Sequence, residues 1–60
     1  MKLDIVCAEE TIGDAHFDSV GLGQTSEGVC SDGFTGNPIA TCTQKGLNGV
    51  FTVDGSCQGL

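Results

Sequence analysis

Hydrophobic and polar residues alternate over short stretches of this chain, and no stretch keeps a helical period for long. Residues 3–7 (LDIVC) and 29–30 (VC) are rich in β-forming residues, and residues 39–43 (IATCT) alternate around Cys42. Residues 45–57 have the pattern of a hairpin, with Asn48-Gly49 at its tip because Asn-Gly is a strong signal for a two-residue turn. The pattern predicts an all-β chain of short strands and turns.

Residues 8–23 show clearly neither the alternation of a strand nor the period of a helix. Glu9 and Glu10, followed by Thr11, Ile12 and Gly13, break any long helix. Residues 14–21 fit one helical turn that Gly21 would cap, and they fit short strands and turns equally well. Small polar residues at 23–26 predict a loop, while Asp32-Gly33 and residues 36–38 (GNP) predict two turns.

The hydrophobic core must be small. The chain has 60 residues, ten of them Gly, with three Phe and no Trp or Tyr. A chain of this length forms one domain, residues 1–60, and hides only about 60% of the surface that its unfolded form exposes. Burial alone is therefore insufficient, and we expect covalent cross-links to contribute to stability.

The four cysteines, Cys7, Cys30, Cys42 and Cys57, supply the candidate cross-links. Two disulfides that close loops of roughly 30 to 35 residues would each add about 3.5 to 4 kcal/mol on the loop-entropy model. The alternative, a zinc site, normally takes its thiolates in close pairs such as C-x2-C. The nearest two cysteines here are 12 positions apart, Cys30 and Cys42. We favour disulfides and an oxidising compartment, and three pairings remain open.

The charge of the chain restricts its partners. Two Lys or Arg against eight Asp or Glu give a net charge of −6, so nucleic acid and anionic membrane surfaces would repel it. Asp4 interrupts the early apolar stretch, and we expect no direct membrane insertion. A basic protein surface is the partner that this charge favours.

The second half of the chain carries a spaced pattern of cysteines, glycines and aromatic residues. In order, these are Cys30, Gly33-Phe34, Gly36, Cys42, Gly46, Phe51 and Cys57. This pattern resembles a sushi domain, also called a complement control protein module or short consensus repeat. The match is specific over residues 28–57, whereas residues 1–27 match only through Cys7.

The resemblance implies a small, elongated, sushi-like β-module with disulfides Cys7–Cys42 and Cys30–Cys57. It also places Phe34 and Phe51 along a hydrophobic seam between the two bridges. The chain departs from the family at two aromatic positions, with Phe51 where a Trp is usual and Gly28 where a Tyr is usual. The interval from Cys7 to Cys30 is also shorter than usual, so the first half is divergent.

The first half contains the candidate site residues. His16 lies between Asp14 and Asp18, a setting in which a histidine can act as a general base, but we expect no catalysis because no activated nucleophile accompanies it. The acidic residues Glu9, Glu10, Asp14 and Asp18 suit calcium by ligand type, yet they lack the order of a dedicated calcium loop. We predict no metal or cofactor, and we expect this acidic face, with an exposed Phe17, to contact a partner protein.

These observations predict a non-catalytic extracellular module for protein binding or cell adhesion, excised from a longer secreted or cell-surface protein. As in sushi proteins, neighbouring modules would then form a tandem array. The alternative is a stand-alone secreted effector, such as a toxin, pheromone or protease inhibitor, with an exposed loop near a bridge. Residues 35–37 (TGN) and 55–57 (GSC) are the candidate loops. A pure spacer within an array is a third possibility.

Overall fold

The structure, a computed structural model, describes residues 4–60. These residues form ten short strands and no helix, which confirms a small, disulfide-rich all-β module. The strands are β1 (Val6–Cys7), β2 (Glu10–Ile12), β3 (Ala15–Phe17), β4 (Val20–Gly21), β5 (Thr25–Glu27), β6 (Val29–Cys30), β7 (Phe34–Thr35), β8 (Ile39–Lys45), β9 (Asn48–Asp54) and β10 (Gln58–Gly59). Strand β1 covers the end of the expected strand at residues 3–7, whose Leu3 lies outside the described residues.

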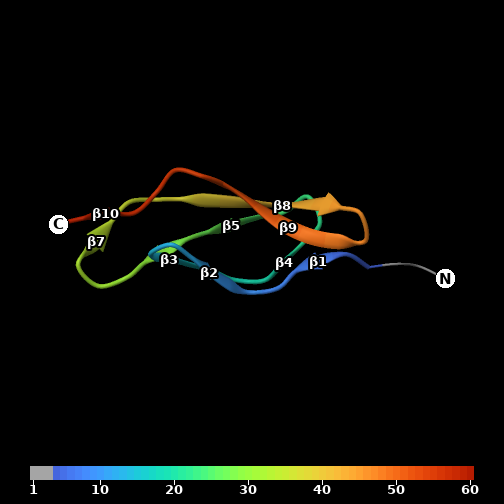
Figure 1. The fold of residues 1–60 in the computed structure, drawn as a ribbon, viewed down its shortest axis with the longest axis horizontal. Coiled ribbons are helices and arrows are strands. Elements are labelled where there is room, and N and C mark those ends of the chain that lie inside the picture. Colours follow the sequence, from blue (N-terminus) through green and yellow to red (C-terminus); the bar gives the residue numbers. More distant parts are fainter. Residues whose placement is uncertain (1–3) are drawn as a thin grey trace.

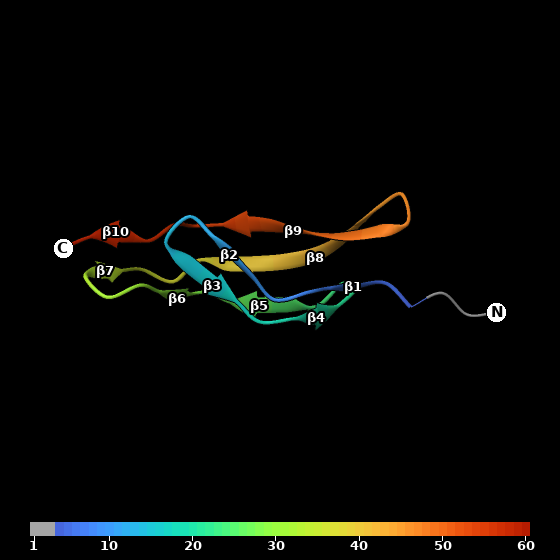
Figure 2. The same ribbon diagram turned by 60° about the horizontal axis from the view of Figure 1, so that its bottom comes forward.

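The strands form four small antiparallel sheets along one long axis. Two sheets have three strands, in the orders β2-β3-β6 and β5-β8-β9, and two are single pairs, β1-β4 and β7-β10. The described chain measures 48 × 15 × 14 Å. Figure 1 shows that the described chain starts toward the end of this axis where β1 lies and finishes at the opposite end, beyond β10. Figure 2 shows β2 and β3 crossing in front of the layer that contains β8 and β9.

The core lies where the two three-stranded sheets face each other. Ala15 and Phe17 from β3 and Ala40 from β8 are buried, and Ile12, Phe51 and Cys57 pack against them. The rings of Phe17 and Phe51 lie 5.8 Å apart between centroids, in a tilted arrangement that aromatic pairs favour. Small side chains at Ala15 and Ala40 let the sheets approach around this aromatic pair.

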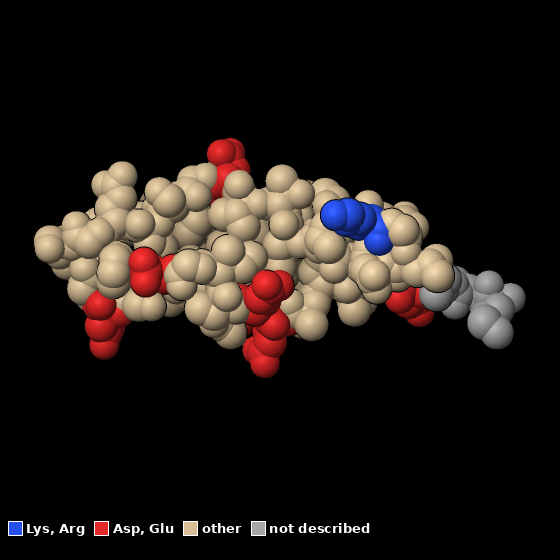
Figure 3. Space-filling model, viewed as in Figure 1, with Lys and Arg blue, Asp and Glu red and all other residues tan. Residues whose placement is uncertain are grey.

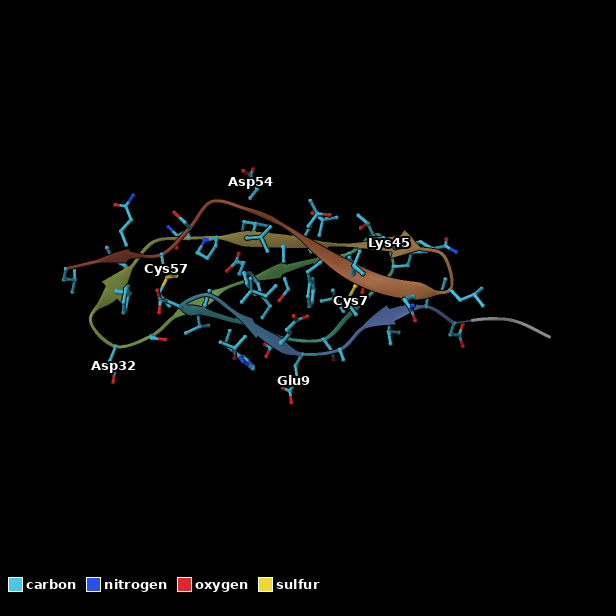
Figure 4. The ribbon with its side chains drawn as sticks, viewed as in Figure 1. Cys7, Glu9, Asp32, Lys45, Asp54 and Cys57 are labelled. Carbon is cyan, nitrogen blue, oxygen red and sulfur yellow. A yellow bond between two sulfur atoms is a disulfide. The ribbon has the colours of Figure 1, made fainter. Side chains whose placement is uncertain are left out.

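Two disulfides, Cys7–Cys42 and Cys30–Cys57, join segments that are distant in sequence. They close intervals of 35 and 27 residues, and no cysteine is free. This pairing is the one that the sushi resemblance implied, and it leaves no thiolates for the alternative zinc site. Figure 4 shows Cys7 and Cys57 well separated along the long axis, so each bridge fastens a different part of the molecule.

The structure corrects two sequence predictions, the turn of the β8–β9 hairpin and the loop at residues 23–26, and it decides between the two alternatives for residues 14–21. The β8–β9 hairpin turns at Gly46-Leu47, because Lys45 pairs with Asn48, and the predicted tip at Asn48-Gly49 is wrong. Residues 14–21 form no helical turn: Ile12 pairs with Ala15 around a two-residue turn, which makes β2 and β3 a hairpin. The predicted loop at residues 23–26 is also partly strand, since Ser26 in β5 pairs with Ala40.

Phe17 is fully buried, with 0% of its surface exposed, so the expectation that it is exposed for a partner protein is wrong. Strand alternation explains its position: Ala15 and Phe17 face the core, and His16 between them faces solvent. Phe51 packs in the core, as expected for the seam. Phe34 does not join this cluster, because β7 carries it to the far end of the molecule, where it pairs with Gly59 of β10.

Candidate functional site

The surface of the molecule is acidic along its whole length. All eight carboxylate residues, Asp4, Glu9, Glu10, Asp14, Asp18, Glu27, Asp32 and Asp54, are exposed. Within residues 4–60, Lys45 is the one Lys or Arg. Figure 3 shows carboxylates spaced along one face, and Figure 4 places Lys45 at the end of β8 where the β8–β9 hairpin turns. Little in the described chain neutralises this charge internally, so it is available to an external cation or basic surface.

The densest group of ionisable side chains lies on the outer face of the β2–β3 hairpin. Nε2 of His16 is 3.6 Å from Oε2 of Glu9 and 3.7 Å from Oδ1 of Asp18. We call these three residues the hairpin cluster. Their side chains are 46%, 72% and 85% exposed for His16, Glu9 and Asp18, respectively. In Figure 4 the labelled Glu9 points away from the body of the molecule.

The hairpin register explains why the cluster forms. His16 pairs with Thr11 across the two strands, and Glu10 pairs with Phe17. Because side chains alternate between faces, Glu9 and Asp18, one residue beyond these strands, continue the outer face that His16 occupies. The ring of His16 is also held from its other side, since Nδ1 lies 3.2 Å from Oγ1 of Thr11. Sequence reasoning missed Thr11, because only the hairpin register brings it opposite His16.

The four acidic residues that sequence analysis grouped do not come together. Glu9 and Asp18 join the hairpin cluster, whereas Glu10 is paired with Phe17 in the strand register and Asp14 lies in the β2–β3 turn. The backbone carbonyl of Asp14 has a structural function, because it accepts hydrogen bonds from N–H and Oγ–H of Ser31 at 2.9 and 3.2 Å. The structure thus separates Glu9 and Asp18 from Glu10 and from Asp14.

Thr11, His16 and Asp18 follow the order hydroxyl, imidazole and carboxylate that nucleophilic catalysis uses. The geometry is that of an open surface rather than of a catalytic pocket. The carboxylate distances exceed the 2.7–3.2 Å range of hydrogen bonds, and all three side chains are exposed to water. An ion or a basic side chain can approach this face freely.

A hollow of about 260 Å³ lies on the other side of the same hairpin. Its apolar lining includes Ile12, Phe17, Pro38 and Val53, and Asp14 contributes the ionisable group at its edge. Pockets for drug-sized ligands usually measure about 300 to 1,000 Å³. The hollow is therefore a gap at the rim of the core, and the hairpin cluster is the stronger candidate site.

The two loops that sequence analysis proposed for a secreted effector lie against each other. A Cβ atom on Gly36 would collide with the backbone carbonyl of Ser56, and Thr35 pairs with Gln58 in the β7–β10 sheet. Gly55 likewise approaches the backbone of Pro38. Neither loop projects alone from the surface, since each packs on the other near the Cys30–Cys57 bridge.

Comparisons with known proteins gave no match: no protein-family model matches the chain, and no curated protein or solved structure matches it significantly. Among residues 4–60 there is also no helix with the length and apolar character that crossing a membrane requires. Two disulfides in so small a domain are typical of extracellular proteins.

Proposed function

We propose that this protein is a non-catalytic extracellular module that binds a basic surface on another protein, with a sushi-like architecture. One observation carries the proposal: every carboxylate of the chain is exposed on a narrow rod that two disulfides fasten at different points along its length. A surface fixed in this way loses little conformational freedom when it binds, which lowers the cost of association.

Two features support the sushi-like part of the proposal. The first cysteine pairs with the third and the second pairs with the fourth, as the resemblance implied. The chain also runs from one end of the rod to the other, which is the form that stacks end to end in a tandem array (Figure 1). A single module this narrow offers a small contact area, so several linked copies would bind more tightly than one.

The test is a binding screen of the disulfide-bonded protein against purified extracellular proteins, by biolayer interferometry at several salt concentrations. We expect a partner with a basic surface, whose association rate falls as salt rises because screening weakens long-range attraction. The matched control is the same chain after reduction and alkylation, which keeps all carboxylates but loses the two bridges. It should bind the partner far more weakly.

A partner that binds equally well at high salt, or binds the reduced chain equally well, would contradict the proposal. Inhibition of a protease or activation of a receptor by the isolated chain would instead support the stand-alone effector. In that case the β7–β10 end, where residues 35–37 and 55–57 meet, would be the region to mutate first.

A further inference from the structure

We propose that the hairpin cluster, Glu9, His16 and Asp18, binds a divalent transition-metal ion of the Zn²⁺ type. The cluster offers one imidazole nitrogen and two carboxylate oxygens, and these three ligand atoms all lie within 4.8 Å of one another. Imidazole and carboxylate are ordinary zinc ligands, and three protein ligands leave a fourth tetrahedral position for water. The spacing of the residues in sequence does not predict this site, because the hairpin register assembles it.

The distances within the cluster suit an ion between the ligands better than direct hydrogen bonds. The separations from Nε2 of His16 are 3.6 and 3.7 Å. With metal–ligand distances of 2.0 to 2.2 Å, neighbouring ligand atoms around a tetrahedral zinc ion lie about 3.3 to 3.6 Å apart. The side chains therefore need only small rotations to surround an ion, and the exposed carboxylates are free to make them.

The ring of His16 is oriented for metal binding. When Nδ1 carries the proton, it donates to Oγ1 of Thr11, which lies 3.2 Å away on the paired strand. Nε2 then presents its lone pair toward Glu9 and Asp18. A hydrogen bond to the second ring nitrogen is the usual way in which proteins fix a metal-binding histidine.

Electrostatics favours a cation at the same position. Glu9 and Asp18 face each other at the open end of the hairpin, and like charges across two strands destabilise their pairing. A divalent ion replaces this repulsion by two attractive contacts and joins the segments before β2 and after β3. Because the set includes an imidazole, it selects Zn²⁺, Cu²⁺ or Ni²⁺ over Ca²⁺ and Mg²⁺, which prefer oxygen ligands only.

The experiment is a titration of the disulfide-bonded protein with ZnCl₂, followed by isothermal titration calorimetry and by NMR of the His16 ring and the backbone amides. We expect saturable binding of one ion, with the largest changes at His16, Glu9 and Asp18. His16→Gln should weaken binding at least tenfold. CaCl₂ at the same concentrations should leave the His16 ring signals unchanged.

Two matched controls separate the site from general acidity. Glu10→Gln and Asp14→Asn each remove one negative charge from the same hairpin without removing a proposed ligand, so both should bind Zn²⁺ like the unmodified protein. Thr11→Val should weaken binding several-fold by freeing the His16 ring, and Thr11→Ser, which keeps the hydroxyl, should restore it. His16 and Thr11 are exposed, so these variants are expected to fold, and far-UV circular dichroism checks this.

Equal binding by the protein and its His16→Gln variant would overturn the proposal. So would NMR changes spread over all eight carboxylates, since these would mean a diffuse cloud of counterions instead of one bound ion. The proposal does not depend on protein binding: the Zn²⁺ titration uses the protein alone.

Discussion

At the scale of single residues, Gly28 and Phe17 show how this chain fills its small core. A Cβ atom at position 28 would lie 2.7 Å from Cε1 of Phe17 and 2.8 Å from Cγ of Pro38. The ring of Phe17, supplied by β3, thus occupies the space beside Gly28. Because Gly28 has no side chain, the first half of the chain can place this aromatic ring against the second half.

This packing predicts that Gly28→Ala destabilises the protein by about 1 to 3 kcal/mol, because the added methyl group overpacks the core. Urea unfolding with both disulfides intact, followed by circular dichroism, measures the change. Gly59→Ala is the matched control, since its Cβ would lie 3.8 Å from the nearest atom of Phe34, an ordinary contact. It should change stability by less than about 0.5 kcal/mol. Equal effects of the two substitutions would contradict the proposed packing around Gly28.

At the scale of elements, both two-residue hairpins turn at a glycine followed by another residue. Gly13-Asp14 connects β2 to β3 and Gly46-Leu47 connects β8 to β9, and both glycines have φ of +62°. Asp14 and Leu47 do not have positive φ, so the turns have the pattern of type II′, which takes Gly at its first central position. The sequence prediction followed the Asn-Gly signal of a type I′ turn and therefore placed the β8–β9 turn two residues too late.

Gly46→Ala should destabilise the protein by about 1 to 2 kcal/mol, because a Cβ atom disfavours positive φ. No atom lies within 4 Å of that added Cβ, so the cost measures backbone conformation without a steric clash. Leu47→Ala at the next position is the control. Leu47 is 77% exposed, and its truncation should stay within about 0.5 kcal/mol. Thermal unfolding of both variants decides this, and a harmless Gly46→Ala would rule out the assigned turn.

At the scale of the whole molecule, the two disulfides differ in their exposure to solvent. Cys7 and Cys42 are 2% and 1% exposed, while Cys30 and Cys57 are half-buried. The bridges close intervals of 35 and 27 residues, which the loop-entropy model converts to similar contributions, about 3.5 to 4 kcal/mol each. Their contributions to stability are therefore alike, but their access to reagents differs.

Limited reduction of the folded protein should open Cys30–Cys57 first, because thiol–disulfide exchange requires access to a sulfur atom. The measurement uses a substoichiometric thiol reductant, alkylation of the released thiols and peptide mapping by mass spectrometry. Label should appear on Cys30 and Cys57 before Cys7 and Cys42. The same reaction in urea is the control, where both bridges should react at similar rates. Earlier labelling of Cys7 and Cys42 in the folded protein would contradict the prediction.

The sequence by itself determined the fold class and the need for cross-links. The chain has few large apolar residues, many glycines and four well-separated cysteines. Because such a chain has too little apolar surface to bury, this composition predicts short strands fastened by disulfides. The alternation around Cys42 also predicted β8, whose Ala40 and Cys42 are buried as an inward face requires. These features are local, or depend on composition, and can be deduced without knowing which strands pair.

Only the tertiary structure decided which residues share a surface. Residues 14–21 fit a helical turn or strands equally well, and the β2–β3 register settled this by turning Phe17 into the core and His16 outward. The same register brings Thr11, Glu9 and Asp18 around His16 and leaves Glu10 and Asp14 elsewhere. A shift of one residue in strand pairing exchanges the two faces, so a site on a hairpin face depends on long-range packing that short-range sequence patterns do not specify.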